Sequence, residues 1–444
     1  MSPETARQLV HISMSAFALL LRVLTWWQAA LCAAAALAFN VFVLPRVGGS
    51  RLARPADAVR GYSLGIVLYP VAVLALILAF PARLDIAGAA WGIMAFGDGA
   101  ATLAGRALGR HRLPWNPDKT LEGLLGFVTA GGASGVFLSW WIAPSIAPAP
   151  APAFTLLAPL AAAAAAGLAE TLPIQLDDNI TVPAVAGGAL WLGSLVSGEA
   201  WLANGSAVAA RLAPAAAVNT VAAAAGWIAG TVRASGTFAG WLIGVAVYAG
   251  LGPGGWLLLF ATFFAAAATS RLGLARKTLL GIAEDRGGRR GAGNAFANTG
   301  LAALAALAAV TTPFRAEAAV AFVAALAAGG GDTVASEIGK AWGRTTYLPL
   351  TRSRVRPGTP GAVSIEGTAA GLVAALALAA LGAWLGLVPW WTIWAVAAGA
   401  AAGSAVESLL AATLEASRTL NNDALNFLNT ATAASVSVAI TRLL

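Results

Sequence analysis

Two stretches of this sequence place an aspartate and small residues directly after a long apolar run. They read GDGAATLAGRALGR at residues 97–110 and GDTVASEIGKAWGR at residues 331–344, and they match at seven of fourteen positions. On a helix, Asp98 and Asp332 would each share a face with small residues, against which another helix can pack closely. A carboxylate on such a face needs a cation, a basic side chain or a metal ion as its partner. The repeated aspartates therefore indicate two related functional sites, and a structural charge pair is the alternative.

Each stretch leads into a segment rich in basic residues. Residues 106–119 contain four basic residues and one acid, whereas residues 340–356 contain five and no acid. Arginine offers forked donors to phosphate, and glycine permits close approach of the backbone. The segments therefore predict phosphate binding, although basic residues beside a membrane also set topology and contact anionic lipid. The candidates for phosphate or nucleotide binding are Arg110, Lys119, Lys340, Arg344, Arg354, Arg356, Gly358 and Gly361.

Further acidic and amide residues stand at the predicted starts of helices. Glu122 and Glu366 begin the next helices, where exposed N–H groups favour an anionic ligand. The motif LDDNIT contains Asp178 and Asn179, and LNNDALN contains Asp423. Oxygen ligands of this kind suit Mg²⁺, which also binds phosphate oxygens, while a solvated helix cap is the alternative. The predicted metal ligands are Asp98, Asp178, Asn179, Asp332 and Asp423.

The composition places these residues in a membrane protein. Of 444 residues, 59% are apolar and 10% are charged, whereas a soluble domain has roughly 25% charged residues. Runs long enough to cross about 30 Å of hydrocarbon recur along the chain, including adjacent ones at 236–252 and 253–270. We predict an all-α polytopic integral membrane protein with about 15 transmembrane helices. The net charge of +8 comes with no basic soluble face, so nucleic-acid binding is not expected.

Basic residues also predict the topology. They cluster in alternate connections between the apolar runs, at 46–60, 106–119, 271–290 and 340–356. By the positive-inside rule, the N-terminus is cytoplasmic and the C-terminus lies outside. The candidate sites then face the cytoplasm, in a membrane such as the inner membrane of a prokaryote.

The order of features is the same in the two halves of the chain. LEG at 121–123 resembles IEG at 365–367, and AAGLAE ending at Glu170 resembles AAGSAVE ending at Glu407. Together with the aspartate stretches, this order indicates a tandem duplication. We expect two parallel units of about seven helices joined by a linking helix, at residues 1–205, 236–444 and 206–235 respectively.

The motifs also resemble known membrane enzymes. Roughly residues 4–185 resemble the phytol kinase and dolichol kinase family, which phosphorylates isoprenoid alcohols with CTP, through ETARQLVH, GDGAATLAGRALGRHRL, KTLEG and ETLPIQLDDNITVP. Roughly residues 236–444 resemble the family that includes the plant phytyl-phosphate kinase, through RRGAGNAFANTG, GGDTVASEIGKAWG, VRPGTPGAVSIEGT and NNDALNFL. In this second unit Glu407 stands where that family is expected to have aspartate, and Ala411 where it has glycine.

The resemblance implies a fused enzyme that converts an isoprenoid alcohol to its monophosphate and then to its diphosphate. It implies Mg²⁺ as the cofactor, CTP as the phosphoryl donor, and catalytic roles for Asp98, Asp332, Glu122 and Glu366. It adds Thr359 and Ser364 to the nucleotide-binding residues.

Three other readings remain open: a transporter with parallel repeats, a nucleotidyltransferase that makes a CDP-lipid, and a membrane scaffold without chemistry. Polar residues crowd toward the predicted cytoplasmic ends rather than the middle of the membrane, which favours the kinase over the transporter. The oligomeric state is not predicted.

Overall fold

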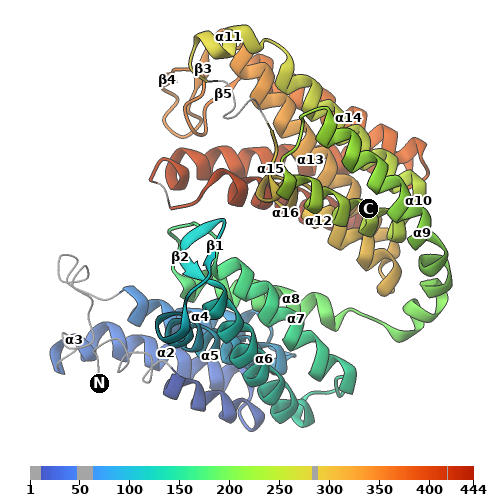
Figure 1. Cartoon of the computed structure of the whole chain (residues 1–444). Helices are drawn as coiled ribbons and strands as arrows, with labels where there is room; N and C mark the ends of the chain where they lie inside the picture. The colour runs from blue at the N-terminus through green and yellow to red at the C-terminus, as the bar shows by residue number, and fades with distance from the viewer. Residues whose placement is uncertain (1–11, 48–63, 283–288, 418) are drawn as a thin grey trace. The chain divides into compact units, whose positions relative to one another are not determined.

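The computed structural model describes residues 12–47, 64–282, 289–417 and 419–444. These residues are helical almost throughout (Figure 1). The motif ETARQLVH and the basic residues at 51–60 lie outside the described residues.

The chain forms two compact units, Met1–Leu195 and Val196–Leu444. The predicted linking helix corresponds to part of α9 (Gly198–Ile228), which belongs by its contacts to the second unit. A functional boundary at residues 206–235 stays a prediction.

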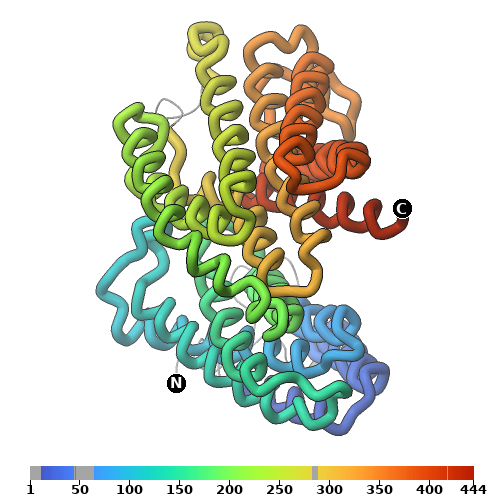
Figure 2. The backbone as a smooth tube through the Cα atoms, turned by 90° about the vertical axis from the view of Figure 1, so that its right-hand side faces the viewer, coloured from blue at the N-terminus to red at the C-terminus, as the bar shows by residue number. Residues whose placement is uncertain are grey.

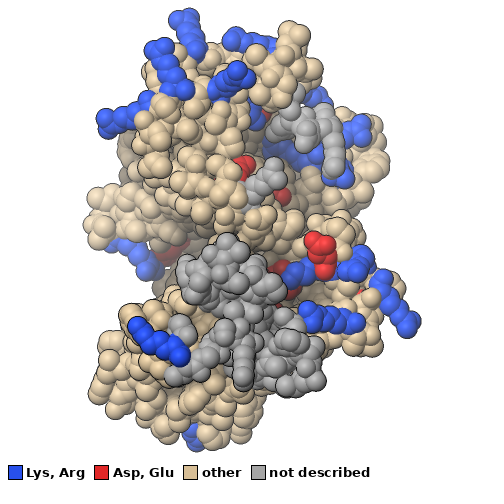
Figure 3. Space-filling model, turned by 90° about the vertical axis from the view of Figure 1, so that its left-hand side faces the viewer, with Lys and Arg blue, Asp and Glu red and all other residues tan. Residues whose placement is uncertain are grey.

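The helices have the length and composition of membrane spans. Among the described residues, eleven are long and apolar enough to cross a membrane, and two further apolar helices are shorter. Large apolar side chains point outward, and Leu202, Ile228 and Trp384 are 82%, 84% and 72% exposed. Such exposure is rare in soluble proteins but suits contact with lipid. Uncharged residues make up most of the described surface in Figure 3. The predicted helical membrane fold is confirmed by these lengths, compositions and exposed apolar side chains.

The first unit contains η1, α2, η2 and α3 to α8 with a two-stranded hairpin. The elements are η1 (Ser15–Arg22), α2 (Trp26–Ala38), η2 (Phe39–Val43), α3 (Leu44–Val47), α4 (Leu64–Ala79), α5 (Leu84–Leu108), β1 (Arg112–Leu113), β2 (Asn116–Thr120), α6 (Leu121–Ile142), η5 (Ala143–Ser145), α7 (Pro152–Glu170) and α8 (Asp178–Ser194). Strands β1 and β2 pair antiparallel, with Arg112 opposite Thr120.

The second unit begins with α9 and ends with the last helix of the chain. Its other elements are α10 (Ala234–Arg271), α11 (Leu274–Leu279), α12 (Ala292–Thr311), α13 (Arg315–Trp342), β3 (Thr346–Tyr347), β4 (Arg354–Val355), β5 (Val363–Ser364), α14 (Ile365–Trp384), η7 (Trp390–Thr392), α15 (Ile393–Leu410), η8 (Ala411–Glu415) and α16 (Asn422–Leu443). Strand β3 lies between β4 and β5 and pairs antiparallel with both.

Helix α10 contains two of the predicted spans in one element. It is 38 residues long and is interrupted at Gly252, whose φ of +71° lies outside the helical region. Pro253 follows and has no N–H to donate to the preceding turn. The kink separates the apolar runs predicted at 236–252 and 253–270.

The helices that carry the repeated aspartates form the centre of each unit. In the apolar windows of α5 and α13, 67% and 78% of the residues are buried, more than in any other described span. Helix α5 packs along α6, and α13 packs against α10, α12, α14, α15 and α16 (Figures 1 and 2). The aspartates are therefore carried by the helices with the least contact with lipid.

The same local packing joins each central helix to the helix after it. A Cβ atom on Gly105 would lie 3.8 Å from the Cα of Gly123, and one on Gly339 would lie 3.7 Å from the Cα of Gly367. At the start of α6 the Thr120 hydroxyl accepts a hydrogen bond from the Gly123 N–H at 3.1 Å. Ser364 caps α14 in the same way, also at 3.1 Å. Small residues and hydroxyl caps thus hold both helix pairs close together.

Candidate active site

Three carboxylates meet in the first unit. Asp98 comes from the C-terminal half of α5, Glu170 from the last position of α7, and Asp178 from the first position of α8. One ligand atom from each lies within 4.8 Å of the others, and this is the one group of its kind among the described residues. Glu170 is buried, with 7% of its surface exposed. We call Asp98, Glu170 and Asp178 the acidic triad.

The turn between α7 and α8 brings two triad members together. Helix α7 ends at Glu170, and Thr171 then donates its N–H to Gly167 and Leu168 carbonyl oxygens. Asp177 caps α8 by accepting the Asn179 N–H at 2.9 Å. Glu170 and Asp178 are therefore held at two consecutive helix ends, whereas Asp98 lies within α5.

Lys119 provides positive charge at the triad. Its Nζ donates to Glu170 Oε1 from strand β2. Burial lowers the pKa of Lys119, but the charge of Glu170, with those of Asp178 and Asp98, outweighs this effect and holds the pKa above its ordinary value. Burial also raises the pKa of Asp178 to about 7, and Glu170 and Asp98 reinforce the rise against Lys119. Among the described residues, three carboxylates thus face one lysine, and negative charge is in excess there.

A divalent cation would relieve this excess of negative charge. Mg²⁺ is bound in proteins by a small number of carboxylates and completes its shell with water and substrate phosphate. One residue beyond Asp178, Asn179 Oδ1 is buried without a hydrogen-bond partner among the described residues. An unpaired buried amide oxygen is unfavourable unless something bonds to it. The oxygen donors of the triad therefore fit Mg²⁺, and of the predicted ligands Asp98 and Asp178 lie together.

Glu122 and Arg110 of the first unit are not members of the triad. Glu122 Oε1 is 2.6 Å from His111 Nδ1, and both carboxylate oxygens accept the His111 N–H at 3.3 Å. Arg110 is exposed at the C-terminal end of α5. In this structure Glu122 holds the hairpin against α6, and a catalytic role for it stays a prediction.

In the second unit, Asp332 of α13 lies against the carboxyl group of Glu407 from α15. Asn429 of α16 donates its Nδ2 to Glu407 Oε2 at 2.6 Å. Asn429 is 1% exposed, and its Oδ1 has no hydrogen-bond partner among the described residues. Positive charge comes from Lys340, which acts electrostatically on Asp332. This group resembles the first in its chemistry: it has two acids, an amide and a lysine, where the first has three acids, an amide and a lysine.

The predicted loop of the second unit packs against the helix that carries Glu407. Gly361 has a φ of +72°, and a Cβ atom there would lie 2.5 Å from the carbonyl oxygen of Ser408. Gly358 has a φ of +86°, and the Thr359 hydroxyl donates to the Arg356 carbonyl at 2.8 Å. Glycine is required at both positions because side chains are strained at such φ values.

The basic residues of this loop differ in how strongly they are held. Arg344, Arg354 and Arg356 are exposed. Arg354 donates its Nε to the Tyr347 hydroxyl at 3.2 Å, and the Arg344 N–H donates to Glu366 at 3.4 Å. Glu366 thus repeats the position of Glu122, with an acid at the helix start accepting a backbone N–H of the preceding loop.

Lys340 and Asp423 have contacts that the sequence did not predict. Lys340 Nζ lies 3.3 Å from Glu337 Oε1, and Glu337 also pairs with buried Lys277 at 2.5 Å. A Cβ atom added to Gly293 would lie 2.2 Å from Asp423 Oδ2. Asp423 therefore lies against the start of α12, and a metal role for it stays a prediction.

Comparison with known proteins identifies the family. The family described as Integral membrane protein DUF92 matches residues 217–434. The "Uncharacterized membrane protein sll0875" of Synechocystis is 40% identical over 202 residues, which cover 45% of this chain and 78% of that protein. The chain belongs to the DUF92 family of integral membrane proteins.

Two further relatives carry informative names. "Protein VTE6, chloroplastic" of Arabidopsis thaliana is 34% identical over 199 residues, 42% of this chain and 59% of that protein. "Farnesol kinase, chloroplastic" of Arabidopsis thaliana is 35% identical over 100 residues, 21% of this chain and 32% of that protein. This DUF92 chain thus matches less than two thirds of each of these two relatives. No solved structure matches it.

Sequence reasoning assigned no role in the site to Glu170 and Asn429, and it singled out Glu407 only because the resembling family is expected to have aspartate there. Glu170 and Glu407 end the matching motifs AAGLAE and AAGSAVE. Their equivalent positions in the two halves of this DUF92 chain were the sequence signal that could have identified them. Asn429 is one amide among several in α16, and the sequence does not distinguish it from the others.

Proposed function

We propose that this DUF92 protein phosphorylates an isoprenoid alcohol in its first unit and the resulting monophosphate in its second unit. The observation that carries this proposal is the meeting of Asp98, Glu170 and Asp178 with Lys119, from four separate segments, at one place in a membrane protein. Its relative named farnesol kinase supports phosphorylation of an isoprenoid alcohol as the class of reaction.

In the proposed first step, the hydroxyl oxygen of the alcohol attacks the γ-phosphorus of CTP. A new O–P bond forms, the bond from the γ-phosphorus to the β,γ-bridging oxygen breaks, and CDP leaves. The hydroxyl proton passes to a carboxylate, for which Asp98 is the candidate because it lies on the most buried helix of its unit. Bound Mg²⁺ would neutralise phosphate charge, since phosphoryl transfer depends mainly on positioning and electrostatic stabilisation. Asp98, Glu170 and Asp178 would hold it.

Lys119 is suited to hold both the triad and a phosphate. The Lys119 side chain is 34% exposed while its ammonium group pairs with Glu170. It can therefore pair with Glu170 and still offer donors to an incoming phosphate. Arg110, which is exposed just before β1, is the second candidate for the nucleotide.

The second unit suits a substrate that is already anionic. Arg344, Arg354 and Arg356 are exposed on a loop with no acidic residue between 340 and 356. This loop touches α15 next to Glu407 through Gly361. More positive charge is expected where two phosphorylated molecules must meet, and CTP is again the proposed donor.

We also propose that the two units descend from a tandem duplication. The caps at Thr120 and Ser364, the close pairs Gly105–Gly123 and Gly339–Gly367, and the acids Glu122 and Glu366 support it, because each has the same local geometry in both units. The predicted topology places both sites on the cytoplasmic side.

The proposal is tested by incubating the purified full chain in detergent with farnesol or phytol, Mg²⁺ and γ-labelled CTP. We expect labelled monophosphate and diphosphate. Asp98→Asn should make neither from the alcohol, and Asp332→Asn should stop at the monophosphate. Asp118→Asn is the matched control, since Asp118 is an exposed acid on the hairpin outside the triad.

Each other outcome contradicts part of the proposal. Absence of label in every lipid product, across alcohols and nucleotides, would exclude a kinase. A product whose mass includes cytidine monophosphate would mean nucleotidyl transfer. Diphosphate formation by Asp332→Asn would remove the second unit from the reaction.

A further inference from the structure

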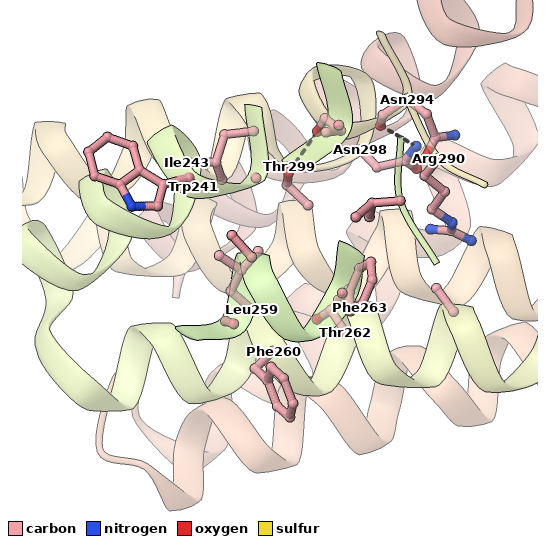
Figure 4. A pocket seen from close by; sticks show the side chains of 18 of the residues that line it. Trp241, Ile243, Leu259, Phe260, Thr262, Phe263, Arg290, Asn294, Asn298 and Thr299 are labelled. Atoms are coloured by element: carbon pink, nitrogen blue, oxygen red, sulfur yellow. Dashed lines mark hydrogen bonds between the residues drawn. The ribbon is translucent and has the colours of Figure 1, made fainter. Parts of the chain in front are cut away.

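A deep pocket lies among four membrane-spanning helices of the second unit. It is bounded by α9, α10, α12 and α13 (Figure 4). The empty volume, including the open mouth of the pocket, is roughly 1010 Å³. Much of its wall is apolar and aromatic, including Trp241, Trp256, Phe260 and Phe263. Ligand pockets are commonly apolar with a few placed polar groups.

The pocket is graded from an apolar end to a polar end. Figure 4 shows Trp241 and Ile243 at one end and Arg290 and Asn294 at the other. The Asn294 side chain makes no hydrogen bond among the described residues, although its carbonyl accepts the Asn298 amide at 3.0 Å. The polar end thus combines a guanidinium and an amide, which together suit a phosphate group.

Several polar side chains of the wall hydrogen-bond within the protein. Trp256 donates its indole N–H to Asn219 Oδ1 at 3.0 Å, and Asn219 donates to the Ala215 carbonyl at 2.8 Å. The Thr262 hydroxyl donates to the Leu258 carbonyl at 2.9 Å. Because these groups are satisfied, the walls away from the polar end suit a hydrocarbon chain.

The polar end adjoins the acids of the second unit. Thr333, in the pocket wall, follows Asp332 directly on α13. Asn294 follows Gly293, which lies against Asp423. The headgroup of a lipid in this pocket would therefore lie beside the residues proposed for the second phosphorylation.

We propose that this pocket holds the acceptor of the second step, an isoprenyl monophosphate. Its hydrocarbon tail lies along the aromatic wall toward Trp241, and its phosphate lies at Arg290 and Asn294. This inference rests on the proposed function for the identity of the ligand. The Arg290 guanidinium at the polar end favours the monophosphate over the free alcohol, which carries no charge.

A larger side chain at Gly240 could fill the pocket without displacing the surrounding helices. It lines the pocket, and a Cβ atom there would meet nothing within 4 Å. Gly240→Phe should therefore occupy the space meant for the tail. Gly198→Phe is the matched control, because Gly198 is also helical, exposed and free of neighbours within 4 Å but lies outside the pocket.

The test measures equilibrium binding of tritiated farnesyl monophosphate and tritiated farnesol to the full chain in detergent, without nucleotide. We expect Gly240→Phe to weaken both ligands about tenfold or more, and Gly198→Phe to change neither. Arg290→Gln should weaken farnesyl monophosphate by about tenfold, because a charge-assisted hydrogen bond is lost, and leave farnesol nearly unchanged. Melting temperatures check that the variants fold.

Two results would overturn the inference. One is undiminished binding to Gly240→Phe; the other is displacement of farnesyl monophosphate by an equal concentration of phosphatidic acid, which would make the pocket a general phospholipid site. Should Gly240→Phe fail to fold, photo-crosslinking of wild type with a diazirine-bearing farnesyl monophosphate decides: label at the lining residues of α9, α10, α12 or α13 supports the pocket, and label elsewhere refutes it. Since binding needs no CTP, a failure of the kinase assay and a failure of the pocket are separate results.

Discussion

Lys119 and Glu170, 51 residues apart in the sequence, form an ion pair at the edge of the acidic triad. Lys119 stands on a short strand, whereas Glu170 ends a membrane-spanning helix and is buried. The pair ties the basic hairpin to the acids beneath it. Any ligand that binds the triad is thereby placed next to the segment predicted to bind phosphate.

Mg²⁺ should stabilise the protein through the triad. Because a ligand that binds only the folded state adds about 2.7 kcal/mol at 100 times its Kd, we expect saturating Mg²⁺ to raise the melting temperature of the full chain. Glu170→Gln should remove most of this rise. Asp118→Asn should keep it, and an equal rise in the two variants would count against a triad site.

Mg²⁺ binding should depend on pH through Asp178. Its pKa of about 7 lies above the value of about 4 in an unfolded chain, so the metal-free folded state keeps a proton that the unfolded chain releases. The contribution of Asp178 to the free energy of unfolding then decreases as pH rises from about 4 to 7. Mg²⁺ requires the ionised carboxylate, so its affinity should be about tenfold higher at pH 8 than at pH 6.

Calorimetric titration at pH 6 and pH 8 would measure this difference. In Asp178→Asn the ratio of the two affinities should fall close to one. A ratio of ten that survives the substitution would assign the proton to another group.

The buried Lys277–Glu337 pair should matter for stability. Both side chains are almost fully buried, at 1% and 3% exposed, and removing one partner leaves an uncompensated charge. We expect Lys277→Met to lower the free energy of unfolding by about 3–5 kcal/mol. The same change at Lys340, whose side chain is 29% exposed and lies 3.3 Å from Glu337, should lower it by less than about 1 kcal/mol.

A chemical or thermal unfolding series on both variants tests this expectation. Adding Glu337→Leu to Lys277→Met should recover part of the loss, since the unpaired carboxylate is then absent. Equal effects of the two lysine substitutions would contradict a special role for the buried pair.

Gly361→Ala should impair the second phosphorylation. The residue has a positive φ, and the new methyl group would meet Ser408 and Ala412 backbone atoms at 2.5 and 2.6 Å. Gly281→Ala is the control, because Gly281 has a φ of +68° and nothing within 4 Å of the added atom. Backbone strain of about 1 kcal/mol is common to both, so only Gly361→Ala should shift the loop and slow diphosphate formation. The ratio of diphosphate to monophosphate in the labelled-CTP assay measures this effect. Equal ratios in the two variants would refute the prediction.

The sequence by itself determined the class of fold and the central residues of the candidate sites. Apolar runs separated by basic loops have one stable arrangement in a bilayer, namely helices, and the helical fold follows. Asp98 and Asp332 were recognisable because the acid and its small neighbours lie within one helix, where spacing sets the shared face. The helix caps at Thr120 and Ser364 also depend only on local sequence, because each hydroxyl accepts a hydrogen bond from the first turn of its own helix.

Only the tertiary structure decided which of these residues meet. Glu170 joins Asp98 and Asp178 because α7 and α8 pack beside α5, whereas Glu122, predicted to be catalytic, pairs with His111 instead. The pocket from Trp241 to Arg290 likewise depends on four helices leaving space between them. Helical periodicity says which face of a helix is apolar, but the packing of side chains between helices determines which faces touch. That packing sets the contacts between residues far apart in the chain, and these contacts cannot be predicted from the local patterns of a single sequence.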